Sequence, residues 1–159
     1  APAVDQIEIC PFLVQEETVN YCQEHDIVVE AWGPLGKGKQ LSEPEIVAIA
    51  KKYNKTPAQI ILRWHLQRGI VSLPKSVHKE RIIQNADIFD FELSKEDMQI
   101  MMSMDLREST GRGYPEQYEY KQNKNEKIKL YGDFLVLIYF YNYLNLNSSS
   151  NFIPNSIPF

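Results

Sequence analysis

Apolar and polar residues follow two different periods along the first two thirds of the chain. Residues 3–9 (AVDQIEI) alternate between apolar and polar positions, which predicts a strand with one polar face. Residues 27–32 (IVVEAW) and 70–73 (IVSL) are short and nearly continuous apolar runs. Such runs are typical of strands that are covered on both faces.

Between and after these strands, apolar residues recur at helical spacing. Helices are expected over residues 16–26, 42–53, 58–68, 79–86 and 94–104. The helix over 58–68 has the clearest buried face, which consists of Ile60, Ile61, Trp64 and His65. Gly69 follows this helix and is expected to end it.

Capping motifs predict where three of the helices begin. In each motif a Ser or Thr is followed three positions later by an acidic or amide side chain, as in Ser42–Glu45, Thr56–Gln59 and Ser94–Asp97. Pro57 strengthens the second motif, because proline is favoured at the first position of a helix.

Strands that alternate with helices in this way predict an α/β fold with a parallel sheet. Three strands joined by helices cannot close into a barrel, so the sheet is expected to have open edges. Composition changes after about residue 106: residues 107–133 are polar, and residues 134–159 carry no charged side chain. We therefore expect two parts, a folded region over 1–106 and a divergent, poorly ordered tail over 107–159.

Composition excludes several classes of protein. Lys and Arg number 17 against 21 Asp and Glu, with no long basic run, which argues against a nucleic-acid partner. The longest apolar run, residues 134–144, is shorter than the ~20 residues of a membrane-spanning helix. Cys10 and Cys22 lack metal-site spacing and are expected to be free, buried thiols, with no metal bound. No secretory signal is visible, so a cytoplasmic location is expected.

Residues 33–39 (GPLGKGK) fit the first half of a phosphate-binding P-loop. Pro34 removes one of the N–H groups that such a loop needs, and Gln40 stands where Ser or Thr would bind magnesium. The following helix is also expected to begin only at Ser42. A P-loop is therefore disfavoured.

A second candidate site for an anion follows the strand over 70–73. Lys75 and Ser76 lie at the strand end, and Arg81 and Asn85 share one face of the first turns of the next helix. A helix N-terminus, a lysine and an arginine together suit a phosphate group. A solvated loop is the alternative interpretation at this point.

Four motifs, VDQIEICPF, VVEAWGPLGKGK, TPAQIILRW and LPKSVHKERIIQNADIFDFELSKEDM, resemble the C-terminal part of the aldo-keto reductase family. The resemblance covers about residues 1–105 and is greatest to microbial diketogluconate and glyoxal reductases. It implies part of a TIM (β/α)8 barrel, the last three β/α units, and an oxidoreductase that uses NADPH to reduce a small aldehyde or ketone substrate. A complete barrel of this kind takes roughly 250 residues.

The resemblance also implies roles for individual residues. Gln6 would contact the nicotinamide carboxamide, and Trp32 would stack on the nicotinamide ring. The loop over the pyrophosphate would consist of Gly33, Pro34, Leu35, Gly36 and Gly38. The 2′-phosphate would be held by Lys75, Ser76 and Arg81, and the adenine would be contacted by Gln84 and Asn85.

The family's catalytic aspartate, tyrosine, lysine and histidine belong to earlier strands, and none of their motifs occurs in this sequence. No catalytic residue is therefore predicted, and the chain alone is expected to be inactive. Three hypotheses follow: a truncated piece of an enzyme that needs an N-terminal half chain as partner, a non-catalytic NADP-binding module, or a non-functional product.

Overall fold

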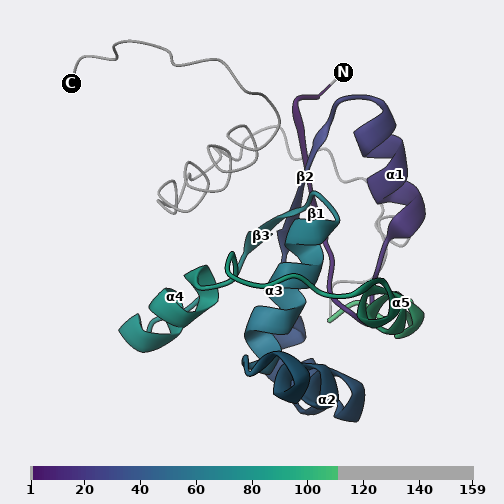
Figure 1. The fold of residues 1–159 in the computed structure, drawn as a ribbon. Helices are drawn as coiled ribbons and strands as arrows, with labels where there is room; N and C mark the ends of the chain where they lie inside the picture. Colours follow the sequence, from purple (N-terminus) through teal and green to yellow (C-terminus); the bar gives the residue numbers. More distant parts are fainter. Residues whose placement is uncertain (1, 111–159) are drawn as a thin grey trace, which may run out of the picture. The chain divides into compact units, whose positions relative to one another are not determined.

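The computed structural model describes residues 2–110 (Figure 1). In chain order, the elements are β1 (Val4–Glu8), α1 (Glu16–Glu24), β2 (Val28–Trp32), the 3₁₀ segment η1 (Gly36–Ser42), α2 (Pro44–Tyr53), α3 (Pro57–Gln67), β3 (Val71–Leu73), α4 (Lys79–Ala86) and α5 (Lys95–Ser103). The tail over 107–159, which is expected to be divergent and poorly ordered, lies almost wholly outside this range.

The three strands form one parallel sheet in the order β1-β2-β3, which confirms the predicted α/β fold. Ile7 and Ala31 are partners in the register of β1 and β2, and Ala31 and Ser72 are partners in the register of β2 and β3. Partners across a parallel sheet point to the same face. The three residues therefore mark one face of the sheet.

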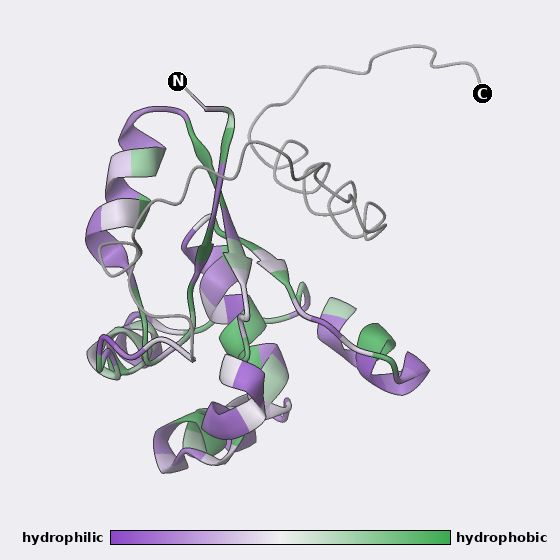
Figure 2. Cartoon of the chain, turned by 180° about the vertical axis from the view of Figure 1, so that it is seen from behind, coloured by the Kyte–Doolittle hydropathy of each residue, from purple (hydrophilic) through white to green (hydrophobic). Residues whose placement is uncertain are grey.

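The core lies between this face and the helices. Ala31, Ile60 and Trp64 are fully buried, so the predicted apolar face of α3 is confirmed. Helix α3 contacts β3, α2 and α4, and α1 contacts β2. Figure 2 shows hydrophobic residues along the strands and hydrophilic residues over most of α1, as the burial of one helix face requires.

Helix α3 begins at the predicted capping motif. The backbone N–H of Gln59 donates to Oγ1 of Thr56 at 3.3 Å, and the N–H of Thr56 donates to Oε1 of Gln59 at 2.9 Å. Pro57 is the first helical residue. Helix α5 begins similarly, because the N–H of Asp97 donates to Oγ of Ser94 at 3.2 Å. Both predictions are confirmed.

The predicted capping motif at Ser42 and Glu45 is wrong. Helix α2 begins at Pro44, its N-cap is Glu43, and no side chain caps its first N–H groups. Ser42 is instead the last residue of η1. Proline explains the difference: it favours the first helical position and holds the preceding residue in an extended conformation, which Glu43 adopts with φ −61° and ψ 130°.

Cys10 and Cys22 are free and buried, as predicted. Within residues 2–110, no three His, Cys, Asp or Glu side chains come together as a metal site. No helix of this part of the chain is long and apolar enough to span a bilayer.

Candidate functional site

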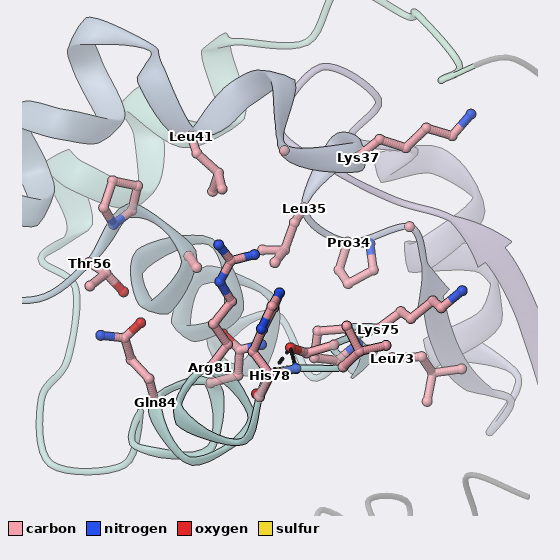
Figure 3. Close-up of a pocket in the computed structure, with 18 residues that line it drawn as sticks. Pro34, Leu35, Lys37, Leu41, Thr56, Leu73, Lys75, His78, Arg81 and Gln84 are labelled. Atoms are coloured by element: carbon pink, nitrogen blue, oxygen red, sulfur yellow. Dashed lines mark hydrogen bonds between the residues drawn. The ribbon is translucent and has the colours of Figure 1, made fainter.

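A cleft of about 680 Å³ lies where the chain leaves β2 and β3 (Figure 3). It is bounded by the loop that follows β2, the start of α3, the loop that follows β3 and one side of α4. The carboxyl ends of parallel strands are where α/β proteins and barrels place their sites. The cleft is therefore the candidate functional site.

The loop after β2 is shaped by glycines with positive φ. Gly33 has a φ of 61° and Gly36 one of 54°, in the left-handed region that a residue with a Cβ adopts at a cost. The N–H of Gly36 donates to the carbonyl of Gly33 at 2.9 Å, and the N–H of Gly38 donates to the carbonyl of Leu35 at 2.8 Å. These bonds fold the loop into consecutive tight turns at the edge of the cleft.

Gly36 also touches the side chain beneath the loop. A Cβ at this position would lie 2.6 Å from Cδ of Gln40, which is closer than two carbons can approach. Gln40 is itself buried, and its Nε2 donates to the Cys10 thiol sulfur at 3.2 Å. Burial, more than any other effect, raises the pKa of that thiol, so Cys10 stays protonated. The loop thus packs on Gln40 and Cys10, two buried side chains without charge.

The loop after β3 forms the opposite wall and leads into α4. Oγ of Ser76 accepts a hydrogen bond from the N–H of His78 at 3.2 Å, just before α4 begins at Lys79. Helix α4 buries none of its own residues. The chain after it is fixed to α3, because Nε2 of Gln59 donates to the carbonyl of Asp87 at 2.7 Å. The helix therefore presents one face to the cleft while its end is anchored in the fold.

The charged side chains that line the cleft are all positive. Lys37, Lys75 and Arg81 line it, and no Asp or Glu is among its lining residues. In Figure 3 the side chain of Arg81 points into the cleft toward Leu35. His78 lines the same wall at the beginning of α4, whose free N–H groups add a positive partial charge. The arrangement suits an anionic ligand, and the anion site predicted from the sequence stays a prediction.

The structure brings most of the predicted site residues together. Those that line the cleft are Gly33, Pro34, Leu35, Gly38, Lys75, Ser76, Arg81, Gln84 and Asn85. Gly36 is buried behind the loop, and Trp32 precedes the loop on β2. Gln6 lies on β1, outside the cleft, where its Nε2 donates to Oε2 of Glu30 at 2.9 Å.

Other lining residues were not predicted to belong to a site: Lys37, Leu41, Thr56, Pro57, Ala58, Leu73, Pro74, Val77 and His78. Thr56 and Pro57 were identified only as the start of a helix. Their place in the wall depends on the packing of α3 against α2 and η1, for which the sequence has no local signal.

Comparison with known proteins identifies the family that this chain resembles. Residues 39–105 match the model of the Aldo/keto reductase family. The chain is 49% identical over 110 residues to the glyoxal reductase of Bacillus subtilis, covering 69% of this chain and 40% of that protein. It is 47% identical over 117 residues to aldo-keto reductase family 1 member A1-A of Danio rerio, covering 67% of this chain and 36% of that protein.

Solved structures give the same result. A Gox0644 mutant in complex with NADPH superposes with a TM-score of 0.68 at 41% identity, covering 76% of this chain and 44% of that one. An aldo-keto reductase of Bombyx mori in complex with NADP superposes with a TM-score of 0.65 at 35% identity, covering 69% and 39%. The chain belongs to the aldo/keto reductase family. It spans less than half the length of these relatives.

Proposed function

We propose that the cleft binds NADPH, and that the chain supplies the cofactor-binding part of an aldo/keto reductase that reduces small carbonyl compounds. The observation that carries the proposal is the charge of the cleft: Lys75 and Arg81 line it beside the N-terminus of α4, with no carboxylate among the lining residues. NADPH carries its phosphates on an adenosine that also needs hydrogen-bond partners.

The residues fit this ligand. A volume of about 680 Å³ lies within the ~300–1,000 Å³ of small-molecule sites. Arg81 offers a two-pronged donor and Lys75 a point charge for the 2′-phosphate, and the Ser76 hydroxyl adds a neutral hydrogen bond. Gln84 and Asn85, farther along α4, offer amides to the adenine. The solved relatives with NADPH and NADP support the choice of ligand.

The loop over 33–38 would cover the pyrophosphate. Its glycines let the backbone approach a ligand closely, and the side chains of Pro34 and Leu35 close one wall. Gln6 and Trp32 are proposed to contact the nicotinamide beyond the cleft. Bound NADPH supplies the hydride that reduces a carbonyl carbon, and the residues described here bind and orient the cofactor for that step.

We further propose that the described residues form the last three β/α units of a (β/α)8 barrel. The family's catalytic motifs do not occur in this sequence, so the chain by itself is expected to bind NADPH without oxidising it. A positioned proton donor contributes ~10²–10⁴-fold to such a reaction, and orientation of the substrate contributes more.

The test is a titration of the full chain with NADPH in which tryptophan fluorescence is measured at each addition. Saturable quenching at or below millimolar NADPH is expected, and it should be largely lost in Trp32→Phe, because Trp64 is fully buried in the core. The absence of saturable quenching in the wild-type chain, confirmed by calorimetry, would contradict the proposal.

A second function is that of one half of a two-chain enzyme, with an N-terminal half chain as partner. Within residues 2–110, β1 and β3 each pair on one side only. Val4 is 45% exposed and Val28 39% exposed on one face of the sheet, so this face has apolar surface for a partner to cover. Mixing the chain with the N-terminal part of the Bacillus subtilis glyoxal reductase should restore NADPH oxidation by glyoxal. A mixture that forms a complex but remains inactive would rule it out.

A further inference from the structure

Glu8, at the end of β1, is a buried carboxylate to which the proposed nucleotide site assigns no role. Its side chain is 5% exposed. One carboxylate oxygen accepts from Oγ of Ser109 at 2.6 Å, and the other accepts from the N–H of Thr110 at 2.9 Å and from the Thr110 hydroxyl. All three donors come from one short segment more than 100 positions away along the chain.

That segment, residues 105–110, is called the strap below. Oδ1 of Asp105 accepts from the N–H of Val14 at 3.3 Å, and the N–H groups of Leu106 and Glu108 both donate to the carbonyl of Phe12 at 3.1 Å. The strap thus leaves α5, runs along the chain that follows β1 and ends at Glu8. Hydrogen bonds at both of its ends fix its course.

The strap also reaches the cleft. The carbonyl oxygen of Thr110 accepts a hydrogen bond of 2.6 Å from Nζ of Lys37. Lys37 lines the cleft and belongs to the loop over 33–38. At the other end of this loop, a Cβ built on Gly33 would lie 3.8 Å from Oε1 of Glu8. Glu8 therefore stands next to the beginning of the loop and, through Thr110, is connected to its middle.

Glu30 shows that burial of a carboxylate on this sheet does not require such a connection. It lies on β2 as the register partner of Gln6, is 6% exposed and accepts a hydrogen bond from the side chain of Gln6. This contact links two strands and does not involve the strap. Glu30 is consequently a matched control for Glu8, with the same charge, similar burial and the same sheet.

From these contacts we infer that Glu8 is a positioning residue for the nucleotide loop: it fixes the strap, the strap holds Lys37, and Lys37 keeps the loop over 33–38 closed against the cleft. The inference rests on the proposed function only where it concerns the nucleotide. A loop that is ordered before binding loses less conformational freedom when the ligand arrives. Glu8 should therefore influence the affinity for NADPH and the rate of NADPH release without contacting the nucleotide.

The first experiment needs no nucleotide. Hydrogen exchange is measured at the amides of Gly36 and Gly38, which donate to carbonyls within the loop. In Glu8→Gln one carboxylate oxygen is replaced by an NH₂ group, which cannot accept a hydrogen bond from Ser109 or Thr110. The backbone amides of Gly36 and Gly38 should then exchange about tenfold faster, the effect of losing roughly one charged hydrogen bond. Lys37→Met should have a similar effect, and the double variant should exchange no faster than the stronger single variant. Glu30→Gln should leave the loop amides unchanged.

The second experiment measures dissociation of NADPH by stopped-flow fluorescence. Release should be about tenfold faster from Glu8→Gln than from the wild type, as expected if the loop opens more readily. Loop amides that exchange at the wild-type rate in Glu8→Gln would overturn the inference. If the loop amides exchange faster in Glu8→Gln but the wild-type chain binds no NADPH, the coupling between Glu8 and the loop stands. Only the proposed function is then overturned. If Glu8→Gln does not fold, Ser109→Ala combined with Thr110→Val removes both hydroxyl donors. Unchanged exchange in that variant would overturn the inference equally.

Discussion

Nδ1 of His65 lies 2.9 Å from Oγ of Ser72, and this contact joins α3 to β3 inside the core. Both side chains are buried, His65 completely. Burial, with a smaller contribution from the charge of Arg68, lowers the pKa of His65 from its usual 6.5 to about 3. The imidazole is therefore neutral in the folded chain at any pH near neutrality.

This histidine should make the fold sensitive to mild acid. Below pH 6.5 the unfolded chain binds a proton on His65 that the folded chain does not bind. The free energy of unfolding should therefore fall as the pH is lowered from about 6.5 toward 3, with His65 contributing a slope that approaches about 1.4 kcal/mol per pH unit. Urea unfolding at pH 7, 6 and 5 measures the slope before most carboxylates begin to titrate.

Two substitutions separate His65 from other groups. His65→Gln keeps a polar side chain beside Ser72 but cannot titrate, so its stability should change much less between pH 7 and 5. His78→Gln, at an exposed position, should keep the wild-type slope. Equal slopes in His65→Gln and the wild type would contradict the assignment.

A second prediction concerns the junction of α2 and α5. The hydroxyl of Tyr53 donates to Oδ2 of Asp97 at 2.6 Å and accepts from the N–H of Ser94 at 2.9 Å. Burial raises the pKa of Asp97, but hydrogen bonds from Lys52, Tyr53 and Ser94 together outweigh it and hold that pKa below 3.8. Tyr53→Phe leaves a buried carboxylate short of a donor and should lower the free energy of unfolding by about 1–3 kcal/mol.

The control for this change is Tyr21→Phe, because the Tyr21 side chain is 58% exposed. Its free energy of unfolding should stay within about 0.5 kcal/mol of the wild type. Chemical denaturation of both variants measures the difference. A Tyr53→Phe variant as stable as Tyr21→Phe would show that the hydroxyl does not stabilise the junction.

A third prediction tests the turn beneath the nucleotide loop. Gly36→Ala should be more destabilising than Gly33→Ala. Both positions have positive φ, but a Cβ at 36 meets Cδ of Gln40 at 2.6 Å, whereas the nearest atom to a Cβ at 33 is Oε1 of Glu8, at an ordinary contact distance of 3.8 Å. The difference should be about 1–3 kcal/mol, the usual cost of overpacking. Adding Gln40→Ala to Gly36→Ala should recover part of that difference, and no recovery would contradict the clash.

Much of the fold could be predicted from periodicity and capping. The Thr56 and Ser94 motifs mark true helix starts. The Ser42 motif fails because Pro44 lies within it and is itself the first residue of the helix. A helix does follow Ser42, but Pro44 fixes its first residue two positions later than the predicted start at Ser42.

The site could be predicted only in part. Arg81 and Lys75 are near each other in the sequence, so their grouping follows from one helix and the loop before it. The contact between Glu8 and Thr110 joins segments 102 positions apart. The alternating pattern of residues 3–9 places Glu8 on a strand but does not indicate its partner, and Thr110 lies outside every predicted helix and strand. Such a contact depends on how the whole chain packs, so no local pattern in the sequence indicates it.

A fourth prediction isolates the phosphate contact. Arg81→Met should weaken binding of NADPH about 10- to 100-fold, the effect of losing a charged hydrogen-bonded pair, while binding of NADH changes little. Lys79→Met removes a charge from the same helix at a position that does not line the cleft. That variant should bind NADPH nearly as the wild type does, and equal losses in the two variants would indicate general electrostatics instead of a specific contact.

The most direct measurement is calorimetric titration of the full chain with NADPH and, separately, with NADH under identical salt. The two cofactors differ only in the 2′-phosphate, which is the group assigned to Lys75, Ser76 and Arg81. We expect NADPH to bind at least tenfold more tightly, equivalent to about 1.4 kcal/mol. Equal dissociation constants for the two cofactors would contradict the assignment of this cleft to NADPH.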